Sequence, residues 1–234
     1  MKFSIRPYRV WCAAARRESA VSAIFTPTGD KEFFTPFGPM MGFVRMPPAL
    51  VEHLNAAMSD QLEDHSASLV GKVRQELRFP KHLVDATAGA LGNALIEYHV
   101  RASRRGSFGD YDHRSKRFEL NVMAGWFVRQ YAHEYNPLHI HTGCALSCVG
   151  YLKLPEGIDE EWAEDDRDHH PTHGHLQFAH GTDTHYSVSN FMIRPRVGDF
   201  YIFPSYMFHS VYPFKTPGER RSFSMNLSVE ESET

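Results

Sequence analysis

The sequence is poor in cysteine, with three in 234 residues. Cys12, Cys144 and Cys148 are an odd number in a long chain, so a disulfide framework is not expected. A chain of this size can form a core without covalent cross-links. Because such cysteine usage is typical of a reducing compartment, we expect a cytoplasmic protein.

Long apolar runs are also missing. No run of eighteen uncharged apolar residues occurs in the chain, which is the length that a membrane-spanning helix needs. Four arginines, Arg6, Arg9, Arg16 and Arg17, interrupt the N-terminal segment where a signal peptide would require an apolar stretch. We therefore expect neither secretion nor a membrane span.

Neither positive nor negative charge is in large excess. Lysine and arginine number 25 against 28 aspartates and glutamates, which leaves a formal charge of -3. This balance gives no bulk electrostatic reason to bind nucleic acid. The local basic runs at 101–105 and 114–117 are more typical of a solvated loop. A nucleic-acid partner is thus not expected on charge.

What the sequence does contain is the composition of a globular domain, with 42% hydrophobic and 13% aromatic residues. Residues 1–47 are rich in aromatics, glycine and proline, which favours irregular or short-strand structure at an edge or lid. Apolar residues then recur every three to four positions over 48–70 and 83–101, which predicts two helices, the first beginning at Pro47-Pro48. We expect residues 1–117 to form an irregular segment and a helical buttress.

After Phe118 the pattern changes to short alternating or apolar runs between turn residues. Their spacing is typical of an antiparallel sandwich or barrel. The predicted fold is therefore α+β but mainly β, with residues 118–234 as a jelly-roll core and the whole chain as one compact domain. The predicted strands are 120–123, 126–131, 146–154, 175–178, 191–194, 199–203, 209–212 and 222–229.

An acidic, histidine-bearing insertion at 159–173 separates two of these strands. A metal site there would need rigid, converging ligands, and a run this polar gives no reason for rigidity. We interpret it as a solvated loop.

Two histidines separated by one residue, His139 and His141, are the first candidate site. In an extended chain, side chains two positions apart point to the same face, so both imidazoles can reach one point while Ile140 packs on the other side. His209 begins a later strand, and in a jelly roll it can converge on the same point from the second sheet. Imidazoles suit iron, and three of them on one side leave positions for oxygen and substrate.

The strand near the C-terminus carries the second candidate site. Alternation places Arg220, Ser222, Ser224 and Asn226 on one face and Arg221 with its odd-numbered neighbours on the other. Arg220 with Ser222 can make a forked, charge-assisted contact to a small carboxylate. A hydrophilic barrel end with Arg220 in a surface ion pair is the alternative.

Several short motifs between Trp126 and Asn226 occur in an order that resembles a known family. They include His139-Ile140-His141, Gly174-His175-Leu176-Gln177-Phe178, Pro195-Arg196-Val197-Gly198-Asp199, Phe203-Pro204-Ser205, His209-Ser210-Val211 and Glu219-Arg220-Arg221-Ser222. In this arrangement the sequence resembles the iron(II)- and 2-oxoglutarate-dependent oxygenases, in particular a group common in bacteria and phages. The resemblance covers nearly half of the chain.

This resemblance implies a double-stranded β-helix that binds iron through two histidines and one carboxylate. His139 and His209 match the two histidines, whereas His141 stands at the position of the carboxylate. Either three histidines hold the iron, or another group completes its ligands. Three neutral imidazoles would leave the iron with one more positive charge than the usual set.

The same resemblance implies how 2-oxoglutarate would bind. Arg220 would contact its distal carboxylate, with help from Ser222 and Tyr151, and Tyr131 matches a tyrosine that lines the cosubstrate site. Packing in the core with a satisfied hydroxyl group is the alternative for each tyrosine. We assign Trp126 and Phe203 to the core.

The expected function is that of a cytoplasmic iron(II)/2-oxoglutarate dioxygenase, a hydroxylase that uses O2 and forms succinate. Its substrate would be a small molecule or a peptide, and a homodimer is left open. One alternative is a cupin-like three-histidine dioxygenase that needs no 2-oxoglutarate, which would leave Arg220 and Ser222 without a role. The other is a non-catalytic jelly-roll binding module whose histidines are satisfied barrel residues.

Overall fold

The computed structural model describes residues 24–34, 38–106, 111–182, 185 and 188–233. Cys12 and the four N-terminal arginines lie outside this part of the chain, as do parts of the predicted edge or lid. No helix in the described part is long and apolar enough to cross a membrane.

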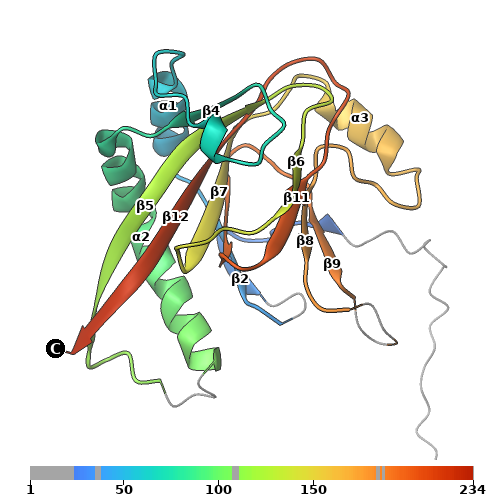
Figure 1. Cartoon of the computed structure of the whole chain (residues 1–234). Helices are drawn as coiled ribbons and strands as arrows, with labels where there is room; N and C mark the ends of the chain where they lie inside the picture. Colours follow the sequence, from blue (N-terminus) through green and yellow to red (C-terminus); the bar gives the residue numbers. More distant parts are fainter. Residues whose placement is uncertain (1–23, 35–37, 107–110, 183–184, 186–187, 234) are drawn as a thin grey trace, which may run out of the picture.

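Two β-sheets face each other and form the main body of the molecule (Figure 1). The larger sheet has the order β2(Lys31–Phe34), β3(Met41–Arg45), β10(Asp199–Pro204), β7(Leu146–Lys153), β12(Arg220–Glu233), β5(Lys116–Gln130), β4(Gln75–Arg78). The smaller has the order β1(Ile24–Phe25), β9(Asn190–Ile193), β8(Leu176–Ala179), β11(Phe208–Val211), β6(Asn136–His139).

The path of the chain through these sheets is that of a double-stranded β-helix. Strands β5, β7, β10 and β12 lie in the larger sheet, and β6, β8, β9 and β11 lie in the smaller one. Neighbouring core strands are antiparallel, and the chain crosses between sheets repeatedly as it advances. The predicted jelly-roll fold is confirmed, although β3 and β4, from before residue 118, extend the larger sheet at both sides.

Helices cover the outer face of the larger sheet (Figure 1). Helix α1(Pro48–Ala57) buries Leu50 and Leu54, and α2(Lys81–Gly106) buries an apolar stripe against β5 and β12. This layer contains the main hydrophobic core, whereas a second core lies between the two sheets. Because the helices cover the outer face of the larger sheet, its inner face points toward the smaller sheet and the space between them.

The first helix is shorter than predicted, since it ends at Ala57 rather than near residue 70. Polar side chains beyond it bond to nearby main-chain groups: Ser59 Oγ accepts the amide of Gln61, and Asp64 Oδ1 accepts that of Ser66. Such local bonds offer the backbone an alternative to the helix. A short 3-10 turn, η1(Ser66–Ser68), follows instead.

The predicted loop at 101–105 is also wrong, because these residues form the last turns of α2. Glu97 pairs with Arg101 one turn later, at 2.8 Å. Arg104 and Arg105 lie in the final turn, where positive charge interacts favourably with the helix dipole. The second basic run, 114–117, leads into β5.

The acidic insertion is not a solvated loop, because it contains helix α3(Ile158–Asp165). Its acidic groups accept main-chain hydrogen bonds: Asp165 Oδ2 accepts the amides of Thr172 and His173 at 2.7 and 2.9 Å. The indole of Trp162 is buried and donates to the carbonyl of His173 at 2.8 Å. The prediction of a solvated loop was wrong because it was based on charge alone and did not consider the apolar side chain of Trp162, which is buried.

We expect Gly150→Ala to destabilise the fold. Gly150 on β7 pairs with Phe223 on β12, and a Cβ at this position would lie 2.3 Å from Cε1 of the Phe223 ring. Because that ring is buried, the clash should cost about 1–3 kcal/mol of unfolding free energy in urea denaturation. Gly89→Ala, on the exposed side of α2 with no atom within 4 Å, should instead stabilise by about 0.5–1 kcal/mol. Equal effects of the two changes would contradict this packing.

Candidate functional site

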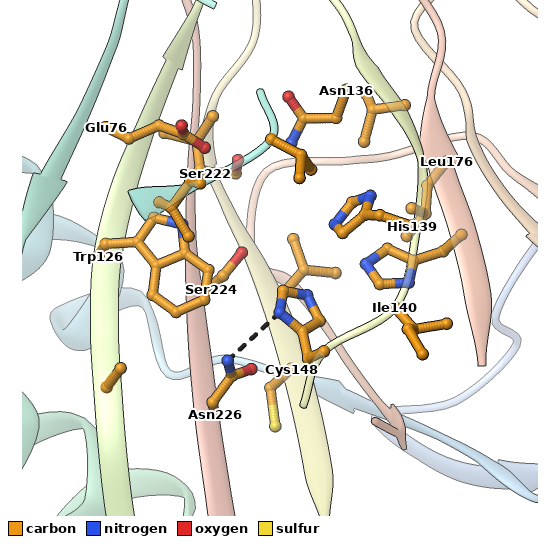
Figure 2. A pocket seen from close by; sticks show the side chains of 18 of the residues that line it. Glu76, Trp126, Asn136, His139, Ile140, Cys148, Leu176, Ser222, Ser224 and Asn226 are labelled. Atoms are coloured by element: carbon orange, nitrogen blue, oxygen red, sulfur yellow. Dashed lines mark hydrogen bonds between the residues drawn. The ribbon is translucent and has the colours of Figure 1, made fainter. Parts of the chain in front are cut away.

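A cavity of about 290 Å³ opens between the two sheets. Figure 2 shows side chains from the larger sheet on one side of it and from β6 and its neighbours on the other. The lining includes the inward residues of β12, of β5 and of β7, together with a segment that precedes β4. Its polar members are His65, Ser68, Glu76, Asn136, His139, His141, Thr142, Tyr151, His209, Arg220, Ser222, Ser224 and Asn226.

Three histidines meet in this cavity. His139 on β6 and His209 on β11 are direct partners across the two strands, and His141 follows β6 two positions later. Their ring centroids lie 4.2 Å apart for His139 and His209, and 5.1 Å apart for each pair with His141. One nitrogen from each ring lies within 4.8 Å of the other two, so the three could hold a metal ion.

Main-chain contacts orient two of these rings. Nδ1 of His139 donates to the carbonyl of Pro137 at 2.7 Å, and Nδ1 of His209 donates to that of Met207 at 2.9 Å. A ring that donates from Nδ1 keeps its Nε2 lone pair for a metal ion. His141 differs, because its Nδ1 lies 3.3 Å from Nδ2 of Asn226.

Burial keeps the three imidazoles neutral. It lowers the pKa of His139 and of His209, and it lowers the pKa of His141 to about 4, with a further contribution from the neighbouring His139. A metal ion binds to the neutral form of imidazole, so all three histidines are in the protonation state that metal binding requires. Among the described residues, no carboxylate joins the three in a group of this size.

Arg220 is buried at the same cavity with no carboxylate partner in the described chain. Its side chain is 2% exposed. Nη1 donates to the carbonyl of Gly174 at 2.8 Å and Nη2 to Oε1 of Gln130, whereas Nε has no partner. Because an uncompensated buried charge is costly, this guanidinium is suited to an anion that enters the cavity. The alternative of a surface ion pair is wrong.

Tyr151 completes this polar corner. Its ring lies 5.9 Å from the guanidinium carbon of Arg220, and its buried hydroxyl has no hydrogen-bond partner in the described part of the chain. Burial raises the pKa of Tyr151 to about 12, so the hydroxyl stays protonated and can donate. Ser222, its partner across β7 and β12, lines the cavity beside it. Two buried donors, the guanidinium Nε and this hydroxyl, thus remain for an acceptor group.

The face assignment for β12 is confirmed by the lining of the cavity. Arg220, Ser222, Ser224 and Asn226 all line it, whereas Arg221 lies on the opposite face and pairs with Glu219 at 2.9 Å. This result follows directly from strand alternation.

Tyr131 is not brought to the cavity. It follows β5 on the same side as Arg129, whose Nη2 donates to the tyrosine hydroxyl at 3.0 Å, and the Arg74 guanidinium lies over its ring. Alternation along β5 turns the preceding residue, Gln130, inward, and it is Gln130 that contacts Arg220. The expected place of Tyr131 beside the cosubstrate is corrected accordingly.

Trp126 and Phe203 are buried, as predicted for core residues, and they also line the cavity. Several polar lining residues were not predicted from the sequence, among them Glu76 and Asn136. Glu76 lies on β4, which was not recognised as a strand, and Asn136 begins β6. Residues 75–78 contain a single apolar side chain, Leu77, and Glu76 and Leu77 are both buried, so there is no alternation that could identify a strand from the sequence.

The buried carboxyl group of Glu76 should make the unfolding free energy of the protein depend on pH. Burial, with a smaller contribution from Asp64, raises the pKa of Glu76 from 4.5 to about 7. The native state therefore holds this proton more tightly than the unfolded chain, and unfolding free energy falls as the pH rises from 4.5 to 7. The loss amounts to about 3 kcal/mol, since one pKa unit corresponds to about 1.4 kcal/mol.

Glu76→Gln should therefore raise the unfolding free energy at pH 8 by up to about 3 kcal/mol and change it little at pH 4.5. Urea denaturation at the two pH values measures the difference. A stability gain that is the same at both pH values would contradict an ionised, unpaired Glu76.

Residues 124–226 match the model of the family described as "Putative 2OG-Fe(II) oxygenase". The match spans the strands from β5 to β12 that carry the three histidines and Arg220. No curated protein sequence matches the chain.

Several solved structures are similar to this chain. An oxidoreductase of the 2OG-Fe(II) oxygenase family from Burkholderia pseudomallei is 13% identical, with 80% of this chain and 84% of that chain covered and a TM-score of 0.48. A Pseudomonas putida prolyl-4-hydroxylase is 17% identical, with 86% and 92% covered and a TM-score of 0.48. A Trichoplax adhaerens prolyl hydroxylase in complex with a hypoxia inducible factor peptide fragment is 13% identical, with 86% and 84% covered and a TM-score of 0.48.

The order of the strands, rather than these distant similarities, identifies the fold. The family model adds a match in sequence across the same strands. The family that the sequence motifs resemble, the iron(II)- and 2-oxoglutarate-dependent oxygenases, is thus the family whose model matches residues 124–226 of this chain.

Proposed function

We propose that this protein is an iron(II)- and 2-oxoglutarate-dependent dioxygenase that hydroxylates its substrate. One observation carries the proposal: three inward-facing histidines line the same cavity as a buried arginine that has no carboxylate partner among the described residues. A metal site alone would explain the histidines, and an anion site alone would explain the arginine. A cosubstrate that chelates the metal with one end and has a carboxylate at the other explains both.

His139, His141 and His209 would hold the iron. Their donor set fits a divalent transition metal, because imidazole nitrogens suit iron and each ring is neutral. Bound iron would supply the activation of O2, and the complete reaction converts 2-oxoglutarate, O2 and a substrate C–H bond into succinate, CO2 and an alcohol.

Arg220, Tyr151 and Ser222 would bind the distal carboxylate of 2-oxoglutarate. The unpartnered Nε of Arg220 and the unpartnered hydroxyl of Tyr151 are both donors, and a carboxylate is acceptor-only. Gln130 and the carbonyl of Gly174 hold the guanidinium in place before the ligand arrives. The protein thus orients the cosubstrate with groups that are already buried, so little reorganisation is needed on binding.

The walls of the cavity would exclude water from the reacting groups. Trp126, Phe203 and Leu176 line it with apolar surface, and each side chain is at most 3% exposed. A volume of about 290 Å³ matches a small ligand rather than a large one, so the substrate enters as a small molecule or as a side chain of a peptide.

Formation of succinate tests this proposal. Purified protein loaded anaerobically with iron(II) and then given 2-oxoglutarate and O2 should release succinate slowly even without substrate, and iron-free protein should not. Iron binding and O2 consumption without any succinate would instead support the three-histidine dioxygenase that needs no 2-oxoglutarate. A failure to bind iron would support the non-catalytic binding module.

His141→Asp should retain iron binding, because it restores the carboxylate of the usual ligand set at the same position. The main chain there is fixed, since the amide of His141 donates to the carbonyl of Ser205 at 2.9 Å. His141→Leu, which offers no ligand atom, should weaken iron binding in an anaerobic titration. If both variants lose iron equally, position 141 does not accept a carboxylate in place of imidazole; if both retain it, His141 is not a ligand.

A further inference from the structure

The cavity has a second polar region that the proposed reaction does not use. Oε2 of Glu76 and Oδ1 of Asn136 are buried, and neither has a hydrogen-bond partner among the residues that the structure describes. Both side chains line the cavity, and Figure 2 shows them at the same end of it, on opposite sides. Glu76 is only 2% exposed and has no cationic partner within 4 Å in the described chain.

The strand register places this region away from the expected carboxylate site. Glu76 on β4 pairs with Val128 on β5, which pairs with Ser222 on β12. Neighbouring strands are about 4.8 Å apart, so the main chain of Glu76 lies about 10 Å from that of Ser222. The two sites thus lie in one cavity but two strands apart.

The main chain of Gly71 lies close to both acceptors. A Cβ at Gly71 would lie 2.9 Å from Oδ1 of Asn136 and 2.9 Å from each carboxylate oxygen of Glu76. This Cβ position is one bond length from the Gly71 Cα, so the three oxygens lie close to the glycine main chain, and a ligand must approach them from the side of the cavity. The backbone at Gly71 does not have positive φ, so its lack of a side chain matters for space rather than for conformation.

The side chain of Asn136 faces the cavity because β6 has an irregularity. His139 pairs with His209, and Asn136 pairs with Val211, with a register shift between the two pairs. The shift lets residues three apart both face the cavity, which regular alternation would forbid.

Two unpaired acceptors, one of them a carboxylate, require a ligand that donates hydrogen bonds. Glu76 is the sole carboxylate among the described residues of the cavity lining. A buried carboxylate is compensated best by a cation that also fills its hydrogen-bonding capacity. Ammonium and guanidinium groups have this chemistry, since they are donor-only.

We propose that Glu76 and Asn136 form a substrate subsite that binds an amino or guanidino group. This inference rests on the proposed function, because it assigns the amino or guanidino group to the substrate of the oxygenase. Arg220 at the other site repels a cation, so the substrate's positive end and the cosubstrate's negative end bind at separate positions. The substrate class is therefore a cationic amine, either free or as a lysine-like or arginine-like side chain.

Binding of simple cations tests the subsite without any turnover. n-Butylammonium and methylguanidinium are added to the full-length protein at pH 8, where Glu76 is ionised, and their dissociation constants are measured by thermal shift and calorimetry. 1-Butanol, which has the same chain without the charge, is the ligand control. We expect at least one of the two cations to bind and 1-butanol to bind more weakly.

Glu76→Gln should weaken binding of the cation about 10- to 100-fold, which corresponds to the loss of a charge-assisted hydrogen bond. Glu63→Gln is the matched control, because it removes the same charge from an exposed side chain that pairs only loosely with Arg78, at 3.7 Å. Gly71→Ala retains the charge, but its methyl group would displace the side chains of Glu76 and Asn136, so it should also weaken binding. A wild-type protein that binds neither cation, or an unchanged affinity in Glu76→Gln, would overturn the proposal.

Manganese(II) and 2-oxoglutarate binding, measured on the same proteins, separates this proposal from the proposed function. Glu76→Gln should leave both unchanged, because Glu76 is not grouped with the three histidines. If wild-type protein binds the cation but neither manganese nor 2-oxoglutarate, the oxygenase function fails and the amine subsite stands. If wild-type protein binds manganese and 2-oxoglutarate but not the cation, the amine subsite is rejected and the proposed function stands.

Discussion

Replacing Arg220 with alanine is expected to weaken 2-oxoglutarate binding by two to four orders of magnitude. The guanidinium is buried, its Nε is unpartnered, and no protein carboxylate compensates its charge in the described chain. If the cosubstrate carboxylate fills this role, Arg220→Ala removes the partner of a buried charge, which costs about 3–5 kcal/mol. Calorimetry with manganese-substituted protein measures the affinity.

Arg221→Ala is the control for this prediction. Its guanidinium points to the other face of β12, where it donates to Glu219 at 2.9 and 3.0 Å and to Asn55. The variant should lose stability, because Glu219 is buried, but it should keep its affinity for 2-oxoglutarate. A larger loss of affinity for Arg221→Ala than for Arg220→Ala would show that the carboxylate binds elsewhere.

His209→Ala should abolish stoichiometric iron binding. His209 is 5% exposed, and its ring centroid lies 4.2 and 5.1 Å from those of the other two histidines and 4.8 Å from that of Phe203, so water cannot easily take its place as a ligand. Loss of an outer partner of a metal ligand commonly lowers affinity 10- to 100-fold, and loss of the ligand itself should exceed that. Anaerobic titration with iron(II) gives the stoichiometry.

His175→Ala provides a control with similar burial. His175 is fully buried in the same half of the molecule, but it does not line the cavity, and its Nε2 accepts from Nε of Arg194 at 3.3 Å. The variant should lose packing energy and still bind one iron. If His175→Ala loses iron while His209→Ala retains it, the metal site is misplaced.

The parts of the site that could be predicted from sequence are those governed by strand alternation. The His-x-His pattern and the Arg220 strand each place their residues by a period of two, and a regular strand preserves that period. The antiparallel jelly roll follows from the number and spacing of short strands, whereas the double-stranded β-helix was implied by the family resemblance. The face of each of these side chains could be predicted because alternation within one strand depends on local geometry alone.

The unpredicted parts depend on long-range contacts or on breaks in regularity. β4 is a strand because it pairs with the edge of β5, some fifty residues later, and four residues carry too little periodicity to show this. Asn136 faces inward only because of the register shift in β6. Tyr131 was assigned by resemblance, whereas alternation along β5 would have selected Gln130.

The position of Glu76 outside the family-matching span has an evolutionary consequence. Every residue that we assign to iron or 2-oxoglutarate lies within 124–226, whereas Glu76 and Gly71 belong to the segment that precedes it. If Glu76 binds the substrate as proposed, mutations in that segment would alter which amine is accepted and leave the residues proposed for iron and 2-oxoglutarate unchanged. New substrate preferences could arise by drift in one short stretch of chain while selection preserves the chemistry in another.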